Sequence, residues 1–332
     1  MEYGNLVAKY NDRGETTHIA VGLRPSGKIH LGNMATVALA GILGRDIGPH
    51  LSKVNITVCD LDMPDASDWC YKQHGYVRYF RDIPDPSGQH DSLLGAATES
   101  IDALVTAMQD ALDVPFFTQL LSSVQQTEAY RDGLKRVVET EGIMDYLLSG
   151  RVPEGNVLAF PLCPECGFTN PKRAEYHDGI IVTDCSNPDC SVEEYETDIM
   201  DCDRDIAVHF FIDPIRDCVV MPRMDVHIFG GDYRDEHDGT HVPKIEKIQR
   251  LWQIAGGEYV PDVLTGPTFY ARDGSKMSKS KNNGLLQATL HNHFSQTGAD
   301  SVSRLIDFVD FLMTEGYKVV DYRVTSEYLL EN

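Results

Sequence analysis

The sequence predicts an α/β fold with a parallel sheet and one small metal-binding insertion. Short apolar runs that are typical of strands alternate with helical segments, a pattern that favours a parallel sheet covered by helices. Residues 151–203 break this pattern, because they are rich in Cys, Pro, Asp and Glu and contain only short strand-like pieces. We therefore expect the first half of a main domain at 1–150, the insertion at 151–203, the second half at 204–285 and a short acidic segment at 286–332.

The first half contains three predicted strands and three predicted helices. The strands are expected at 18–23, 52–62 and 114–123, and the helices at 34–43, 91–113 and 130–150. The strand at 52–62 has the β-branched and apolar content of a buried strand. The two longer helical segments carry apolar residues at the 3.6-residue spacing of an amphipathic helix.

The alternation resumes after the insertion. A strand is expected within "DVHIFGGD" (225–232), a helix at 242–256, and further strand content within 261–274. A last helix is expected at 301–313, followed by a short acidic tail. The two halves together predict one sheet that is interrupted by the insertion.

Composition excludes several classes of protein. The 332 residues include 51 Asp plus Glu against 29 Lys plus Arg, which gives a net charge of −22. This balance opposes broad contact with nucleic acid unless basic residues cluster. No apolar run approaches the roughly 20 residues of a membrane span. The first residues lack the layout of a secretory signal, so we expect a cytoplasmic protein without membrane contact.

The turn "RPSGKIHLGN" (24–33) lies between the first predicted strand and the first predicted helix. Backbone N–H groups at a helix N-terminus point outward, and the helix dipole there favours an anion. The turn therefore indicates a phosphate site. An ordinary strand-to-helix turn, whose histidine serves only the local structure, is the alternative.

The segment "DGSKMSKSKNNG" (273–284) carries three lysines and a single apolar residue. Such a segment has too little apolar surface to enter a core, so we expect an exposed cationic loop. Local positive charge in so acidic a chain favours a polyanionic ligand, although a solvated turn is the alternative. Lysines beside β- and γ-phosphates stabilise the charge that develops during nucleotidyl transfer.

Four of the eight cysteines form two close pairs. Cys163 and Cys166 have two residues between them, and Cys185 and Cys190 follow after a gap of 18 residues. This spacing is typical of a structural Zn²⁺ bound by four thiolates, as in zinc ribbons. Four free thiols are the alternative, but this segment has few large apolar residues around which to fold without a metal.

Two of these motifs together resemble those of the class I aminoacyl-tRNA synthetases. "HLGN" (30–33) stands where that family has His-Ile-Gly-His, and "KMSKS" (276–280) matches its second motif letter for letter. The resemblance implies a Rossmann-like catalytic domain that binds ATP, with His30, Asn33, Lys276 and Lys279 as catalytic residues. The ATP-binding residues that it implies are Pro25, Ser26, Gly27, Lys28, His30, Gly32, Asn33, Lys276, Met277, Ser278, Lys279 and Ser280.

Further segments are similar to the class I lysyl-tRNA synthetases. They are "RDIPDPSGQHDSLLGAATES" (81–100), "PLCPECG" (161–167) and "DVHIFGGD" (225–232). Lysine is therefore the first candidate substrate, although Tyr233 stands where that family has a histidine and "VVMPRMD" (219–225) lacks the family's tryptophan. A lysine ammonium needs a buried carboxylate partner. The candidate residues of the amino-acid pocket are Arg24, Asp60, Asp62, Asp65, Asp232 and Tyr233.

The resemblance implies ATP-dependent formation of an aminoacyl-adenylate, with Mg²⁺ as the cation. The acceptor stays open between tRNA and a small molecule or protein. Acidic residues outnumber basic ones seven to three in 285–332, so we expect a catalytic domain without anticodon recognition that contacts at most the acceptor end of tRNA. A synthetase-like binding or regulatory protein without catalysis, and another nucleotidyltransferase of the same superfamily, are the alternatives.

Overall fold

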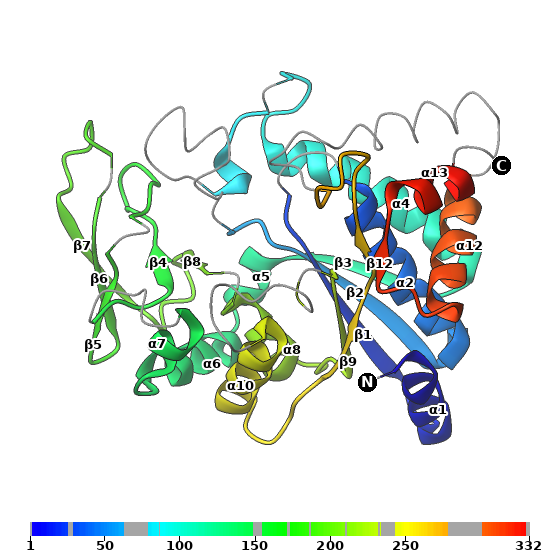
Figure 1. Cartoon of the computed structure of the whole chain (residues 1–332). Coiled ribbons are helices and arrows are strands. Elements are labelled where there is room, and N and C mark those ends of the chain that lie inside the picture. The colour runs from blue at the N-terminus through cyan, green and yellow to red at the C-terminus, as the bar shows by residue number, and fades with distance from the viewer. Residues whose placement is uncertain are drawn as a thin grey trace.

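A five-stranded parallel sheet forms the centre of this computed structural model, with strand order β10-β9-β1-β2-β3 (Figure 1). The structure describes all residues except 1, 26–28, 63–78, 86, 149–154, 171–172, 186, 210, 232, 234–242, 278–300 and 330–332. The five strands are β1 (Thr17–Leu23), β2 (Ser52–Val58), β3 (Phe116–Leu120), β9 (Val226–Phe229) and β10 (Asp262–Thr265). The α/β fold that the sequence predicts is confirmed.

Strand β1 occupies the middle of the sheet and joins the two halves of the chain. It pairs with β2 from Thr17↔Ser52 to Leu23↔Val58, and on its other edge it pairs with β9 at Ile19↔Val226. The chain therefore builds the sheet outward from β1 in both directions. In open parallel sheets such a reversal of strand order opens a crevice at the carboxyl ends of the strands, where ligands bind.

One face of the sheet is covered by helices from both ends of the chain (Figure 1). They are α1 (Tyr3–Arg13), α2 (Leu31–Ile47), α4 (Leu93–Leu112), α12 (Ser301–Thr314) and α13 (Tyr322–Leu329). Helix α2 lies against β1 and β2 and is itself covered by α4 and α12. We call the apolar core on this side the α2-side core.

Helix α2 is apolar nearly all round because it is buried on all sides. Gly41 permits the closest approach, since a Cβ there would lie 2.5 Å from Leu112 Cδ1 and 2.9 Å from Phe116 Cζ. The absence of a side chain at Gly41 therefore lets α2 approach α4 and β3 closely.

The opposite face of the sheet is covered by shorter helices, and we call the apolar core on that side the α10-side core. They are α5 (Leu121–Gln125), α6 (Glu128–Glu139), α7 (Ile143–Leu148), the 3₁₀ helix η3 (Asp213–Ile215), α8 (Arg216–Val219) and α10 (Lys244–Gly256). The expectation of one helix at 130–150 is wrong. Gly142, with φ of +73°, separates α6 from α7, a backbone conformation that glycine adopts without strain.

The insertion is a separate antiparallel unit that extends away from the sheet (Figure 1). Its strands are β4 (Ala159–Pro161), β5 (Glu175–His177), β6 (Ile180–Asp184), β7 (Glu194–Asp198) and β8 (Ile206–Val208). Strand β4 pairs with β8, so the unit closes at Val208, a few residues beyond the predicted end at 203. Tyr79 ties it to the main domain, because its buried hydroxyl donates to Phe160 O and accepts from Ala207 N.

The C-terminal residues 301–329 pack into the α2-side core. Phe308, Leu312 and Val320 are fully buried there. Strand β12 (Val319–Val320) pairs in parallel with β11 (Thr268–Phe269), the strand that leads into the lysine-rich segment. Two further 3₁₀ helices are η1 (Pro49–Leu51) and η2 (Phe80–Asp82). Among the described residues, no helix has the length and apolar character that crossing a membrane requires.

Replacing Gly41 by Ala tests the close packing of α2. The new Cβ contacts two buried side chains, so we expect a loss of about 1–3 kcal/mol in the free energy of unfolding. Gly4→Ala is the matched control, since nothing lies within 4 Å of its Cβ position. There we expect a gain of up to about 1 kcal/mol from helix propensity. Urea denaturation of both variants checks the pair, and equal stabilities would contradict this packing.

Candidate active site and metal centre

The N-terminus of α2 is the best-defined part of the predicted ATP site. His30 is its N-cap residue, and the His30 Nδ1 atom accepts a hydrogen bond of 3.3 Å from the backbone N–H of Asn33. A neutral imidazole that accepts at Nδ1 carries its proton on Nε2. A Cβ at Gly32 would lie 2.9 Å from His30 Cε1, so a glycine there leaves space for the ring.

Asn33 adds a polar group to this helix end. Its side-chain Oδ1 is buried and accepts no hydrogen bond from the described residues. The preceding Pro25 and Ile29 are buried and join β1 to the helix, while Ser26, Gly27 and Lys28 lie outside the described part. The first-turn N–H groups of a helix lack intrahelical partners, so this arrangement suits an anion such as a phosphate.

Lys276 ends a tight hairpin that leaves β11. Tyr270 and Lys276 form an antiparallel bridge, and Asp273 Oδ1 accepts a 2.9 Å hydrogen bond from Ser275 N within the turn. Met277 donates its N–H to Phe269 O and packs against the α2-side core. The hairpin that begins the lysine-rich segment is therefore anchored on the same side of the sheet as α2. Ser278, Lys279 and Ser280 lie outside the described residues.

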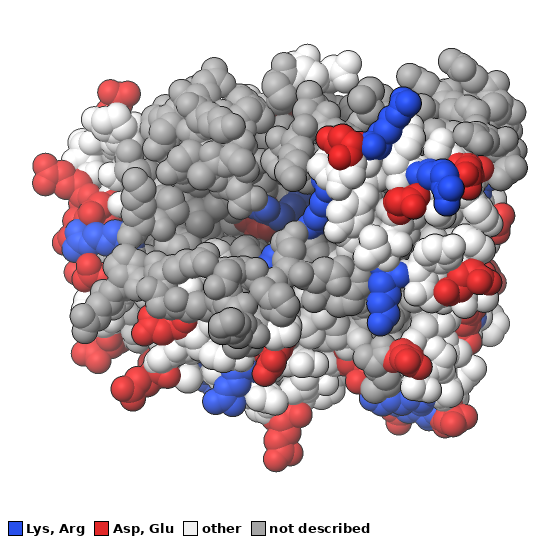
Figure 2. All heavy atoms as spheres, viewed as in Figure 1, with Lys and Arg blue, Asp and Glu red and all other residues white. Residues whose placement is uncertain are grey.

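Arg24 and Asp62 meet where β1 and β2 end. Arg24 Nε lies 3.0 Å from Asp62 Oδ2, and the guanidinium lies 5.4 Å from the centroid of the Phe80 ring. Asp62 is only 4% exposed, whereas the Arg24 side chain is 36% exposed. A hollow near the centre of the face in Figure 2 contains basic and acidic side chains, at the level where β1 ends in Figure 1.

Asp60 points elsewhere. Its carboxylate is fully buried and accepts a 2.9 Å hydrogen bond from Ser122 N at the start of α5. Burial raises the pKa of Asp60 above its ordinary value. Asp60 therefore links the start of α5 to the end of β2. Asp65 and Asp232, two other predicted pocket residues, lie outside the described residues.

Tyr233 follows β9, on the other edge of β1 from Asp62. Its ring stacks on Phe229 with 4.6 Å between centroids, and Lys244 Nζ lies 5.6 Å from its ring centroid. Phe229 in turn stacks on His227 at 3.9 Å. The structure thus places Arg24, Asp62 and Tyr233 at the carboxyl ends of three neighbouring strands.

A buried ionic cluster lies under these strand ends. The sequence did not predict it. Arg216 Nη1 lies 2.7 Å from Asp213 Oδ2, and Asp217 Oδ2 lies 2.6 Å from His227 Nδ1. All four side chains are less than 10% exposed. The sequence around the cluster is "DPIRDC" (213–218). Three of its six residues are charged, a composition that is typical of a surface turn.

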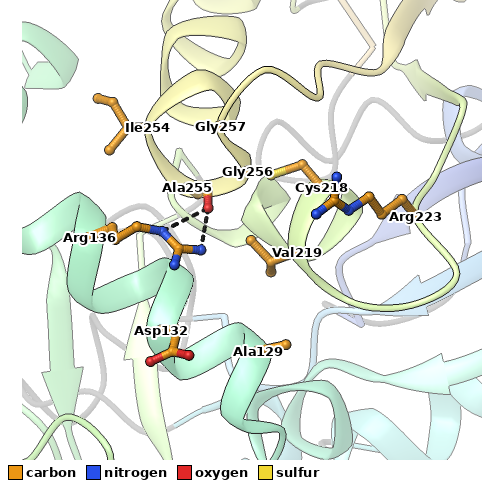
Figure 3. A pocket seen from close by; sticks show the side chains of 10 residues that line it. All are labelled: Ala129, Asp132, Arg136, Cys218, Val219, Arg223, Ile254, Ala255, Gly256 and Gly257. Carbon is orange, nitrogen blue, oxygen red and sulfur yellow. Dashed lines mark hydrogen bonds between the residues drawn. The ribbon is translucent and has the colours of Figure 1, made fainter.

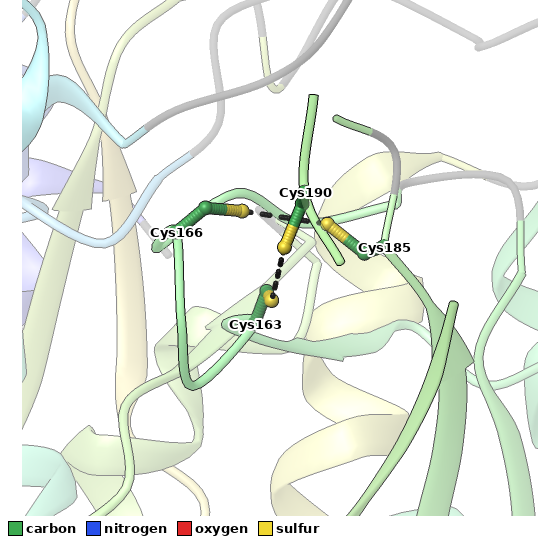
Figure 4. Close-up of side chains that lie close together, drawn as sticks. All are labelled: Cys163, Cys166, Cys185 and Cys190. Atoms are coloured by element: carbon green, nitrogen blue, oxygen red, sulfur yellow. Dashed lines mark hydrogen bonds between the residues drawn. The ribbon is translucent and has the colours of Figure 1, made fainter. Parts of the chain in front are cut away.

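The four cysteines of the insertion converge at one point (Figure 4). Their sulfur atoms lie within 4.8 Å of one another, with Cys163–Cys190 at 3.7 Å and Cys166–Cys185 at 3.4 Å. Four thiolates at about 2.3 Å from a tetrahedral Zn²⁺ lie roughly 3.8 Å apart, so the cluster fits the metal. Such a site has no open position for substrate, and its zinc would serve to hold the insertion together.

Backbone amides also prepare these sulfur atoms for a metal. The N–H groups of Phe168, Asn187 and Val192 donate to the sulfur atoms of Cys166, Cys185 and Cys190 respectively. Hydrogen bonds to the charged form of a ligand favour that form and orient it. Among the described residues, this is the one group of His, Cys, Asp or Glu side chains that could hold a metal ion.

A cavity of about 470 Å³ lies apart from all of these residues (Figure 3). It is lined by residues of α6, α8 and α10 and of the turns that follow α8 and α10, among them Asp132, Arg136 and Arg223. Arg136 Nε donates to Ala255 O at 3.0 Å and so fixes the end of α10. None of the predicted site residues that the structure describes lines this cavity, and we assign no ligand to it.

Comparison with known proteins decides the family. The family described as "tRNA synthetases class I (K)" matches residues 4–201, more than half of the chain. The chain belongs to this family. The lysine–tRNA ligase of Archaeoglobus fulgidus is 29% identical over 184 residues, which cover 52% of this class I synthetase chain and 36% of that ligase. The chain therefore spans little more than a third of that curated relative.

Solved structures of class I synthetases are also similar to the chain. The tyrosyl-tRNA synthetase of Archaeoglobus fulgidus, complexed with L-tyrosine, has a TM-score of 0.44 at 17% identity and covers 84% of this chain and 64% of that one. A glutamate tRNA ligase from Elizabethkingia meningosepticum, in complex with its amino acid, has a TM-score of 0.38 at 14% identity and covers 81% and 53%.

Replacing one cysteine tests the zinc centre of this class I synthetase. Metal analysis of the purified chain is expected to find one zinc ion per molecule, held by the four clustered thiolates. Cys163→Ser should lose that zinc and unfold the insertion, since the metal supplies much of its folding energy. Cys218→Ser is the control, because that cysteine is buried beneath α10, away from the cluster. A folded insertion without bound metal would contradict the assignment.

Proposed function

We propose that this chain activates an amino acid with ATP, forming an aminoacyl-adenylate and releasing pyrophosphate. The observation that carries the proposal is the N-terminus of α2, which follows the central strand β1 and carries His30 and Asn33. Family membership supports this activity. Lysine is the first candidate substrate, supported by the likeness to a lysine–tRNA ligase.

In the proposed reaction the carboxylate oxygen of the amino acid attacks the α-phosphorus of ATP. The new oxygen–phosphorus bond forms as the bond to pyrophosphate breaks, and the leaving group gains negative charge. His30 Nε2–H and the first-turn amides of α2 donate to this charge from one side. Lys276 would donate to the same charge from the lysine-rich segment, and the resemblance to the family gives Lys279 the same role.

Mg²⁺ bound to the phosphates would neutralise part of the charge on the leaving group. No described group of carboxylates is arranged to hold this ion alone. The chain's own residues bind and orient the phosphates. In the amino-acid subsite, the Asp62 carboxylate and the Arg24 guanidinium form a pair to which an amino acid's ammonium and carboxylate are complementary.

The acceptor that we propose is the 3′ end of tRNA, in keeping with the family. The cationic segment that begins at Lys276 and the insertion are the parts that would contact the acceptor end. A binding or regulatory protein without catalysis, and another nucleotidyltransferase, are the competing functions. An active exchange assay would exclude the first of them.

Amino-acid-dependent exchange of pyrophosphate into ATP tests the proposal. We expect lysine to support exchange among the twenty amino acids, with no need for tRNA. His30→Ala should lower the rate roughly 10²–10³-fold, the usual loss for one preorganised donor, with a much smaller effect on ATP affinity. His50→Ala is the matched control, an exposed histidine that follows the far end of α2. Absence of exchange with every amino acid, with and without tRNA, would contradict the function.

Charging of altered tRNA transcripts tests the proposed acceptor. We expect transfer to depend on the acceptor end, to show little dependence on the anticodon, and to weaken with added salt. The reason is that residues 301–329 pack into the catalytic core and that acidic residues outnumber basic ones over 285–332. The measurement compares the charging of lysine tRNA transcripts with intact and with replaced anticodons, at low and at moderate salt. Strong anticodon dependence would contradict this expectation.

A further inference from the structure

The four residues Arg216, Asp213, Asp217 and His227, which we call the Arg216 cluster, lie under the strand ends and take no part in the reaction as proposed. The Arg216 side chain is 3% exposed, so its charge cannot reach a substrate directly. Two carboxylates of the cluster lie close to this guanidinium, Asp213 at 2.7 Å and Asp217 at 3.6 Å. A buried cation with two carboxylates is sensitive to geometry, because the attraction offsets desolvation only when the groups are well placed.

The cluster contacts the ends of both strands that lead to Arg24 and Asp62. The Arg216 Nη2 atom lies against β1 so closely that a Cβ at Gly22 would be 2.8 Å from it. At the end of β2, Cys59 Sγ donates a hydrogen bond of 3.0 Å to Asp213 Oδ2. Burial and the neighbouring Asp213 carboxylate raise the pKa of Cys59 well above its usual value, so the thiol keeps the proton that it donates.

The cluster also reaches β9 and, through two rings, Tyr233. Asp217 accepts or shares the proton of His227 Nδ1 at 2.6 Å, which fixes the orientation of the imidazole. Phe229 stacks on that imidazole, and Tyr233 stacks on Phe229. The three strand ends that carry Arg24, Asp62 and Tyr233 therefore rest on one ionic cluster.

The position of the cluster separates it from the ATP motifs. Ile29, Leu31 and Met277, which anchor those motifs, pack in or against the α2-side core. Cys59, Phe229 and Tyr233 instead pack in or against the α10-side core, on the other face of the sheet. A change in the cluster therefore displaces Arg24, Asp62 and Tyr233 more than it displaces the N-terminus of α2, which we assign to ATP.

We propose that Arg216 is a positioning residue for the amino-acid subsite and holds Arg24, Asp62 and Tyr233 in place through the ends of β1, β2 and β9. This inference rests on the proposed function and adds that the two substrates are positioned from opposite faces of the sheet. ATP is held from the α2 side. The amino acid is held from the side of the Arg216 cluster.

A matched pair of arginine variants tests the proposal in the exchange assay. Arg216→Lys keeps the charge but shortens the reach to Asp213 and Asp217, so the strand ends shift. The KM for the amino acid should rise by up to about 100-fold, since a misplacement of about 1 Å can cause a loss of that order, while the KM for ATP changes less than about two-fold. Arg131→Lys is the control, because Arg131 is equally buried but binds the backbone oxygens of Gln125 and Arg204.

A second variant keeps the test valid if Arg216→Lys fails to fold. Gly22→Ala leaves every charge in place and displaces only the guanidinium, so the same selective rise in the KM for the amino acid is expected, with a smaller size. Equal rises for the amino acid and ATP, or an equal effect of Arg131→Lys, would overturn the positioning role. A wild-type chain that exchanges with no amino acid would instead overturn the proposed function, and the inference with it.

Discussion

The site depends on how closely α2 can lie against β1. The helix is buried on all sides, and its small residues allow the sheet, α4 and α12 to approach it. This packing places the first turn of α2 at the carboxyl end of the central strand, where the strand order reverses. His30 then caps the helix through Nδ1. The roles in ATP binding that we assign to His30 and to the first turn of α2 follow from that contact between helix and strand.

Electrostatics explains why the arginines near the strand ends are paired with aspartates. With a net charge of −22, the surface repels polyanions, so positive charge has to be concentrated where phosphates bind. Arg24 is paired with Asp62, and Arg216 with Asp213 and Asp217. These pairs hold arginines under and beside the strand ends without adding net positive charge there. In the insertion, buried apolar residues and the four-cysteine cluster occur together.

Local patterns predicted the elements that depend on local chemistry. The strand at 18–23, the turn before α2 and the cysteine spacing were predictable because each has a short-range cause: a continuous apolar run, helix capping or tetrahedral coordination. The Arg216 cluster was not predictable, since "DPIRDC" becomes a buried segment only through β1, β2 and β9, which are distant in sequence. The break at Gly142 was also missed, although its cause, a glycine with positive φ, is local. Asp60 was expected to face a ligand, and its partner Ser122 lies 62 residues away.

The central claim is that the N-terminus of α2 receives the phosphates of ATP. A crystal structure of the chain with a non-hydrolysable ATP analogue and lysine tests it most directly. The account predicts phosphate oxygens within hydrogen-bonding distance of His30 Nε2 and of the first-turn amides of α2, with the amino acid on the side of Arg24 and Asp62. An analogue bound elsewhere, such as the cavity beside Arg136 and Arg223 between α6 and α10, with the α2 N-terminus vacant, would contradict it.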